Sequence, residues 1–186
     1  MAESLQQRAT GHGSAMESVH EVHIAPMRET EAEMVATLVR DIVEPLPYYN
    51  QLARQSEIAK YSADHLLASM QEDPHSVAVA RVDDQVVGFS ISRFDDFLIW
   101  ISWIGVHPEA RRSGVARALL ADIERTAVLR GAHKVWADSR TDNSVMAVLF
   151  PQAGYERIAT IARHWYQQDF HLWQKLIEDS NASTSR

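Results

Sequence analysis

The stretch FLIWISWIGVHPEARRSGVA, residues 97–116, decides how this chain folds. Residues 97–106 are almost all apolar, a pattern typical of a strand covered on both faces at the centre of a sheet. Pro108 ends this strand. A helix from about Gly114 to Arg130 follows, because apolar residues recur there at helical spacing. Its buried stripe comprises Ala116, Leu119, Leu120, Ile123 and Ala127.

The turn between this strand and this helix has the properties of an anion site. The first N–H groups of a helix have no intrahelical partner, and the positive end of the helix dipole lies beside them. Gly114 leaves room for a ligand to approach the backbone, and Arg111 and Arg112 add positive charge to a chain of net charge -7. We therefore expect a phosphate or pyrophosphate to bind here. The chain contains neither GxxxxGK[ST] nor GxGxxG, the two other common phosphate loops.

The remaining patterns predict an α/β (α+β) fold. The expected sheet is mixed and mostly antiparallel, with helices on both faces. The strand at 97–106 and the next strand should be parallel because a helix connects them, whereas the other pairs should be antiparallel and hairpin-linked. The other expected elements are an edge strand within 20–27, a helix from Thr30, a weaker helical or loop segment at 48–61, a short helix near 66–70, a hairpin over 77–91, a strand at 134–138, a helix at 143–150 that Pro151 bends or ends, and strands near 155–162 and 170–176.

Length and composition restrict the classes of protein to consider. We expect a flexible leader at 1–20, a single domain at 21–178 and a flexible tail at 179–186. The absence of cysteine excludes disulfides and a cysteine nucleophile and fits a cytoplasmic location. No apolar run approaches the roughly 20 residues that cross a bilayer, and the negative charge argues against binding to nucleic acid. His20 and His23 would face opposite sides of a strand, so we expect no metal site.

Two motifs of this sequence resemble those of a known protein family. Residues 111–116, Arg-Arg-Ser-Gly-Val-Ala, are similar to the acyl-CoA signature [Q/R]-x-x-G-x-[G/A] of the GNAT acyltransferase superfamily. The segment from Asn143 to Gly154 and Tyr155 resembles the later motif of that family, an Asn, a helix and then Gly-aromatic. The similarity is strong over 97–155 and extends over 22–176 in the order of elements. It implies a GNAT-like fold in which one parallel strand pair splays apart. It further implies an N-acetyltransferase that carries the acetyl group of acetyl-CoA to a primary amine of a small molecule, peptide or protein by direct attack in a ternary complex.

The resemblance also implies which residues bind acetyl-CoA. The main chain of Ile104 and Val106 would pair with the pantetheine arm in the splayed gap. The side-chain amide of Asn143 would bond the same arm, although an Asn there also suits a helix N-cap. Phe150 would lie beside the thioester. The pyrophosphate would be held by the turn, in which Arg111 begins the signature and the amides come from Arg112, Ser113, Gly114, Val115 and Ala116.

The catalytic groups are less well defined. The backbone N–H of Val106 is the candidate donor to the oxyanion. Relatives often carry a tyrosine acid at the position of Phe150 and a glutamate on the central strand, and both are missing here. Candidate bases are Asp138, His164 and Tyr166, for which a capping Asp, a surface His and a packed Tyr are the ordinary alternatives. A relay of water molecules would serve equally well.

The acceptor amine is not identified by the sequence. Tyr48 and Tyr49 lie where relatives build acceptor pockets, and Trp103 and Trp136 lie on the strands that flank the gap, where core packing is the ordinary alternative. The acidic net charge mildly favours a cationic acceptor. A homodimer remains open as the oligomeric state, and so does transfer of a longer acyl group. A catalytically silent acyl-CoA-binding or sensor module is the alternative function, because the family's acid and base are missing.

Overall fold

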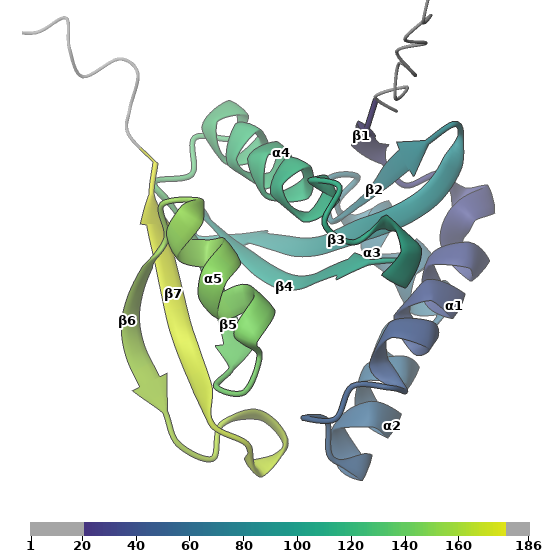
Figure 1. Cartoon of the computed structure of the whole chain (residues 1–186). Helices are drawn as coiled ribbons and strands as arrows, with labels where there is room; N and C mark the ends of the chain where they lie inside the picture. Colours follow the sequence, from purple (N-terminus) through teal and green to yellow (C-terminus); the bar gives the residue numbers. More distant parts are fainter. Residues whose placement is uncertain (1–20, 178–186) are drawn as a thin grey trace, which may run out of the picture.

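A computed structural model describes residues 21–177, so that the expected leader, the expected tail and His20 lie outside the described residues. These residues form a seven-stranded sheet in the order β1-β2-β3-β4-β5-β7-β6, flanked by helices (Figure 1). The predicted fold class is confirmed. The elements are β1 (His23–Pro26), η1 (Glu29–Glu31), α1 (Ala32–Val43), α2 (Gln51–Lys60), α3 (Ala63–Glu72), β2 (Val77–Val82), β3 (Gln85–Asp95), β4 (Leu98–Val106), η2 (Pro108–Ala110), α4 (Val115–Leu129), β5 (Lys134–Arg140), α5 (Ser144–Gln152), β6 (Glu156–Ile161), η3 (Trp165–Gln167) and β7 (Phe170–Leu176).

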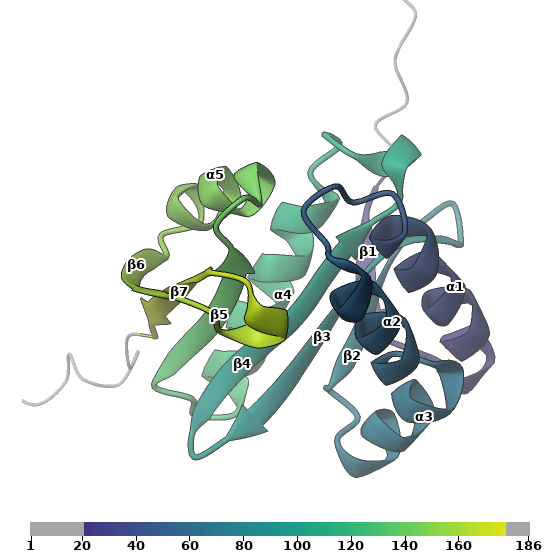
Figure 2. The same ribbon diagram turned by 90° about the horizontal axis from the view of Figure 1, so that it is seen from below.

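Helices cover both faces of the sheet (Figures 1 and 2). On one face α1, α2 and α3 pack against β2 and β3 through a core that includes Val39, Leu66 and Phe89. On the other face α4 and α5 pack against β4, β5 and β7 through a core that includes Leu120 and Phe150. The apolar residues that recur along α1 and α4 form these two buried stripes, as their helical spacing predicts.

The pairing of the strands agrees with most of the sequence prediction. β4 is the central strand, β1 is an edge strand, and β4 and β5 are the parallel pair. The other pairs are antiparallel, but the expectation that all of them are hairpin-linked is wrong. Three helices separate β1 from β2, and β6 separates β5 from its neighbour β7.

Neither face of β4 is buried along its whole length, which corrects the expectation that both faces are covered. Ile99 and Ile101 lie in the core, whereas Trp100, Ser102 and Ile104 are only partly buried. For Ser102 and Ile104 the reason is the short pairing with β5, which ends at Ile101↔Ala137 although β4 continues to Val106 and β5 to Arg140. Beyond this pair the two strands splay apart and leave a gap.

Two helix boundaries differ from the sequence prediction. Gly114 is the N-cap of α4 rather than its first residue, and its φ of 89° is a conformation that favours glycine. Pro151 lies within the last turn of α5, which ends one residue later, at Gln152.

Candidate functional site

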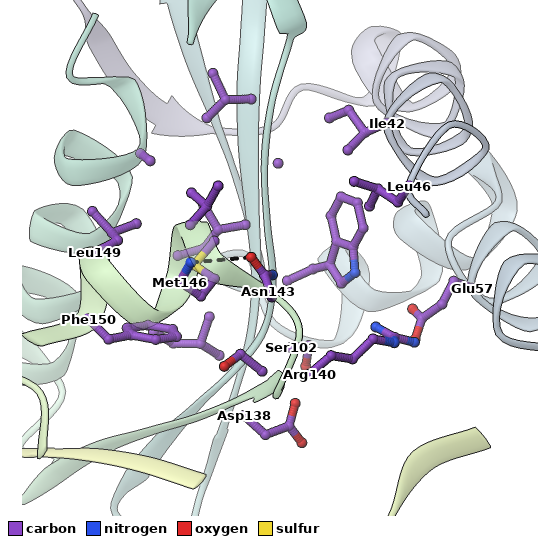
Figure 3. A pocket seen from close by; sticks show the side chains of 18 of the residues that line it. Ile42, Leu46, Glu57, Ser102, Asp138, Arg140, Asn143, Met146, Leu149 and Phe150 are labelled. Carbon is purple, nitrogen blue, oxygen red and sulfur yellow. Dashed lines mark hydrogen bonds between the residues drawn. The ribbon is translucent and has the colours of Figure 1, made fainter. Parts of the chain in front are cut away.

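A large cavity follows the gap between β4 and β5. Its volume is about 720 Å³, and it is lined by the second half of β4, the end of β5, the β4–α4 turn, α5, the α1–α2 region and the β6–β7 loop. Figure 3 shows Met146 and Leu149 of α5 on one side of this cavity and Ile42 and Leu46 of the α1 region on the other. The gap between β4 and β5 is therefore bordered by α5 on one side and by the α1 region on the other.

The free edge of β4 presents main-chain groups to this gap. The amide of His107 donates to the carbonyl oxygen of Val87 on the β3 side, at 2.8 Å. Successive amides along a strand point in opposite directions, so the N–H of Val106 must point away from β3 and toward the gap, as must that of Ile104. Both residues also line the cavity. They can therefore form hydrogen bonds with a ligand that takes the place of a missing strand.

The β4–α4 turn leaves its amides open at one end of the cavity. The first intrahelical bond of α4 runs from the amide of Ala118 to the carbonyl of Gly114, so the amides of Val115, Ala116 and Arg117 have no acceptor within the helix. A methyl group placed on Gly114 would meet no atom within 4 Å. Open amides, the helix dipole and unoccupied space make this turn fit a pyrophosphate.

The side chains of the turn have separate roles. Arg111 and Arg112 line the cavity together with Gly114, Val115 and Ala116. Ser113 does not line it. Instead, its hydroxyl donates to the carbonyl of Ala110 at 2.6 Å and holds the turn in shape. The amide of Ser113 is still available for the ligand role that the sequence predicts, but its side chain is occupied.

The α5 side of the cavity contains the second motif. The side-chain oxygen of Asn143 accepts a hydrogen bond from the amide of Met146 at 3.2 Å, so that Asn143 is the N-cap of α5 (Figure 3). Asn143 also lines the cavity, so its amide nitrogen remains available to a ligand. Phe150 is 2% exposed and packs against Tyr155 and Trp173, with ring centroids 5.1 and 5.5 Å away. Phe150 therefore forms an apolar wall that cannot donate a proton.

Asp138 lies just beyond Ala137, the last residue of β5 that pairs with β4, where the gap begins. Its Oδ2 accepts a hydrogen bond from Trp165 Nε1 at 2.8 Å and lies 3.8 Å from Nε2 of His164. Burial raises the pKa of the Asp138 carboxyl, although Trp165 and His164 act in the opposite direction. The structure thus brings together two of the candidate bases, of which Asp138 lines the cavity and His164 does not.

The third candidate, Tyr166, belongs to the loop between β6 and β7. The loop is tied to the α1–α2 region because Asn50 Nδ2 donates to the carbonyl of Tyr166 at 2.9 Å and Gln168 Nε2 donates to that of Tyr48 at 2.6 Å. Burial and the nearby Glu57 carboxylate raise the pKa of Tyr166 to about 12. At neutral pH its hydroxyl is therefore a hydrogen-bond donor rather than a base.

The aromatic residues expected at the acceptor site divide into two groups. Tyr48, Tyr49 and Trp103 line the cavity. Trp136 does not, which corrects the expectation that it contacts the acceptor. It precedes the point where the strands separate, and its ring packs against Trp100 at 5.9 Å while Lys134 Nζ lies 4.1 Å from its centroid.

Two buried charged residues of the cavity were not predicted from the sequence. Glu57 on α2 and Arg140 at the end of β5 are 8% and 7% exposed and line the cavity. Arg140 could have been found, because it follows Asp138 by two positions and so lies on the same face of a strand. Glu57 gave no signal, since α2 is rich in polar residues and only its packing shows which of them are buried.

Other kinds of site are not indicated in the part of the chain that the structure describes. Residues 21–177 contain no group of three or more His, Asp or Glu side chains that could hold a metal ion. Within the same range, every helix is too short or too polar to cross a bilayer.

The splayed parallel pair, with an anion-binding turn at the start of the next helix, defines an acyl-CoA-dependent N-acyltransferase fold. Residues 37–155 match the family described as the acetyltransferase (GNAT) family, and the chain belongs to it. The predicted family is thus confirmed, as are the enzyme class, an acyl-CoA-dependent N-acetyltransferase, and acetyl-CoA as the co-substrate.

Individual relatives agree with this assignment. An acetyltransferase of Pectobacterium atrosepticum is 29% identical over 110 residues, which cover 59% of this chain and 72% of that protein. The N-acetyltransferase of Staphylococcus aureus Mu50 has the same fold with a TM-score of 0.71 and 16% identity, covering 85% of this chain and 99% of its own. The PaiA N-acetyltransferase of Thermoplasma acidophilum, solved in complex with coenzyme A, has a TM-score of 0.70 and 16% identity to this chain. The match covers 84% of this chain and 99% of that protein.

Proposed function

We propose that this enzyme transfers the acetyl group of acetyl-CoA directly to a primary amine while both substrates are bound. The observation that supports this proposal is the continuity of the cavity. It extends from the open turn around Gly114, through the gap between β4 and β5, to the chamber lined by Tyr49, Glu57 and Trp103. We refer to this chamber, which also includes Tyr48, Tyr61, Asp138, Arg140 and Tyr166, as the acceptor chamber. A direct transfer requires both substrates to meet in one such space.

The donor end of the cavity fits acetyl-CoA. The turn amides would bind the pyrophosphate, and the main chain of Ile104 and Val106 would pair with the pantetheine arm. The amide nitrogen of Asn143 would bond the same arm. The N–H of Val106, which points toward the gap, would donate to the oxyanion that develops on the thioester carbonyl.

Asp138 is our candidate for the group that accepts the proton of the amine. An amine similar to that of lysine has a pKa near 10.4, so it arrives as an ammonium and must lose a proton before it can attack. A carboxyl whose pKa is raised by burial is a better match to this task than an ordinary one. The neutral amine then forms the C–N bond, the C–S bond breaks and the thiolate of CoA leaves, while the nitrogen gives up its second proton to solvent water. His164, at 3.8 Å, is placed to pass the proton toward solvent.

No side chain need protonate the leaving group. Phe150 occupies the place where relatives often have a tyrosine acid, and its ring is enclosed by Tyr155 and Trp173. A thiol with a pKa of about 8.5 leaves readily as the thiolate. We therefore propose that the missing acid is compatible with turnover.

The lack of cysteine supports a cytoplasmic location for this reaction.

The test is release of CoA thiol from acetyl-CoA in the presence of a panel of small amines, amino acids and peptides. We expect thiol release that depends on the acceptor, with one acetyl group added to it by mass. Asp142→Asn, at an exposed position close to the end of β5, is the control variant and should match the wild type. Acetyl-CoA binding without turnover on any acceptor would reject the enzyme and favour the silent acyl-CoA-binding module.

A further inference from the structure

Two oppositely charged side chains in the acceptor chamber each have one buried atom without a hydrogen-bond partner. Glu57 Oε2 and Arg140 Nη2 are both buried, and among the described residues neither has a hydrogen-bond partner. Glu57 comes from α2 and Arg140 from the end of β5. Both line the cavity, and their opposite charges interact electrostatically without forming a salt bridge (Figure 3). A buried charge without a partner costs several kcal/mol, so such a pair indicates that a ligand completes the site.

Arg140 is fixed in a conformation suited to bind an anion. Its Cζ lies 3.5 Å from the ring centroid of Tyr49 and 5.0 Å from that of Phe170, so aromatic rings pack around the guanidinium. Its Nε donates to Gln168 Oε1 at 3.0 Å. These contacts leave the Nη edge for a ligand, and a planar pair of N–H donors matches a carboxylate.

Glu57 provides the opposite charge. Burial raises the pKa of its carboxyl, while Lys60 and Arg140 act in the opposite direction and Asp138 adds to the rise. The Tyr166 hydroxyl also lies close to the carboxyl. An ammonium placed next to Glu57 would give its free oxygen a charged donor, the kind of partner that a buried carboxylate requires.

The charges of the acceptor chamber balance one another. The carboxyls of Glu57 and Asp138 face the cations of Lys60 and Arg140 in the same cavity. The acidic net charge of the whole chain, which mildly favours a cationic acceptor, is therefore not concentrated here. Among these four groups, the buried atoms without a hydrogen-bond partner are one carboxylate oxygen and one guanidinium nitrogen, and a ligand that carries one charge of each sign would match both.

We propose that the acceptor is a small zwitterion of the amino acid type, whose carboxylate binds Arg140 and whose ammonium binds Glu57. This inference rests on the proposed function, because it names the substrate class of the same site. The ammonium passes one proton to Asp138, and the neutral amine attacks the thioester carbon as described above. Arg140 and Glu57 are thus specificity-determining residues that contact the acceptor.

The test compares three matched acceptors, namely phenylalanine, phenylalaninamide and phenethylamine, with a parallel set built on leucine. The amide and the amine keep the reacting nitrogen but lack the carboxylate. For wild-type enzyme we expect kcat/KM for the amino acid to exceed that for either analogue by about 100-fold or more in at least one set, since a buried group left without its partner penalises the analogue.

Arg140→Met then tests the assigned residue, because methionine keeps much of the packing on Tyr49 and removes the charge. We expect this variant to lose about 100-fold in kcat/KM on the amino acid but less than about threefold on the decarboxylated amine. Arg140→Lys should recover part of the preference. Arg93→Met, at an exposed position on β3, is the control and should keep it in full. If Arg140→Met binds acetyl-CoA with unchanged affinity, its fold is intact. If that variant does not fold, Arg140→Lys and the comparison of acceptors with the wild type still test the proposal.

The outcomes separate the two proposals. Turnover of phenethylamine or phenylalaninamide equal to that of the amino acid would overturn the zwitterion and leave the acetyltransferase intact. An equal loss on both kinds of acceptor in Arg140→Met would do the same, since it would show a structural role for the arginine. No thiol release with any acceptor would reject both.

Discussion

The indole nitrogen of Trp165 donates a hydrogen bond of 2.8 Å to Oδ2 of Asp138. This bond joins the β6–β7 loop to the end of β5, immediately beyond Ala137, the last residue of β5 that pairs with β4. Because the gap between the strands begins there, the bond fixes a carboxyl at the place where the two halves of the cavity meet. The carboxyl is buried and its pKa is raised, so it lowers the stability of the fold, a cost that its proposed role as the base would explain.

Asp138→Asn should lower kcat by about 100-fold or more, because an amide cannot accept the proton of the amine. The same variant should be more stable than the wild type at neutral pH. The folded state raises the pKa of the carboxyl and so favours its neutral form, which means that ionisation above the unfolded pKa of about 3.9 destabilises the wild type. The gain in Tm should disappear in acid, where the carboxyl is neutral in both states. Activity near that of the wild type would remove Asp138 from the mechanism.

The pH profile should change with the donor to Asp138. For the wild type, kcat/KM should fall as the pH decreases through the raised pKa of Asp138. Trp165→Phe removes a hydrogen bond that lowers this pKa, so the acid limb should move to higher pH. Trp165 is 52% exposed, which leaves the core unaffected. If the acid limb of the pH profile is not shifted in Trp165→Phe, a group other than Asp138 controls that limb.

Phe150→Tyr should change kcat by less than about threefold, because thiolate departure needs no acid if the leaving group has a pKa near 8.5. The variant restores the side chain that relatives often have at this position. Steady-state kinetics with a good acceptor is the measurement, and the Tm reports the effect of the added hydroxyl on packing against Tyr155 and Trp173. A rise in kcat of about tenfold would contradict the view that the leaving group departs unaided.

The regions of the fold that depend on local sequence were predictable. Pro108, Gly114 and the apolar stripe of α4 lie close together in the chain, so the strand, the turn and the helix could all be expected from them. The extent of strand pairing could not, because nothing in the residues around Trp136 shows that β4 and β5 separate immediately after Ala137. Trp136 was therefore assigned to the wrong side of that boundary.

The acceptor chamber was only partly predictable for the same reason. Its aromatic residues Tyr48, Tyr49 and Trp103 could be expected from their position between elements or on the central strand. Glu57 and Arg140 come to line one cavity only when the tertiary fold brings α2 and the end of β5 to it, and this arrangement has no local signature at Glu57. Of the two residues that we propose to determine specificity, Arg140 could thus be expected from its position on the strand of Asp138, and Glu57 could not.

The turn around Gly114 offers a matched pair of variants. Gly114 and Gly131 lie at opposite ends of α4, have φ values of 89° and 67°, and would each place a new Cβ in open space. A glutamate at either position suffers comparable backbone strain, on the order of 1 to 2 kcal/mol. Only Gly114→Glu would put a carboxylate where the pyrophosphate is expected, so any difference between the two variants reports the ligand.

Isothermal titration calorimetry of acetyl-CoA with the wild type, Gly114→Glu and Gly131→Glu is the most direct test of the claim that this turn holds the acyl donor. We predict that Gly131→Glu binds within about twofold of the wild type and that Gly114→Glu binds at least about 100-fold more weakly, because two like charges would share one site. Equal affinity of all three proteins for acetyl-CoA would contradict the account, since the donor would then bind somewhere other than the amides that follow Arg111.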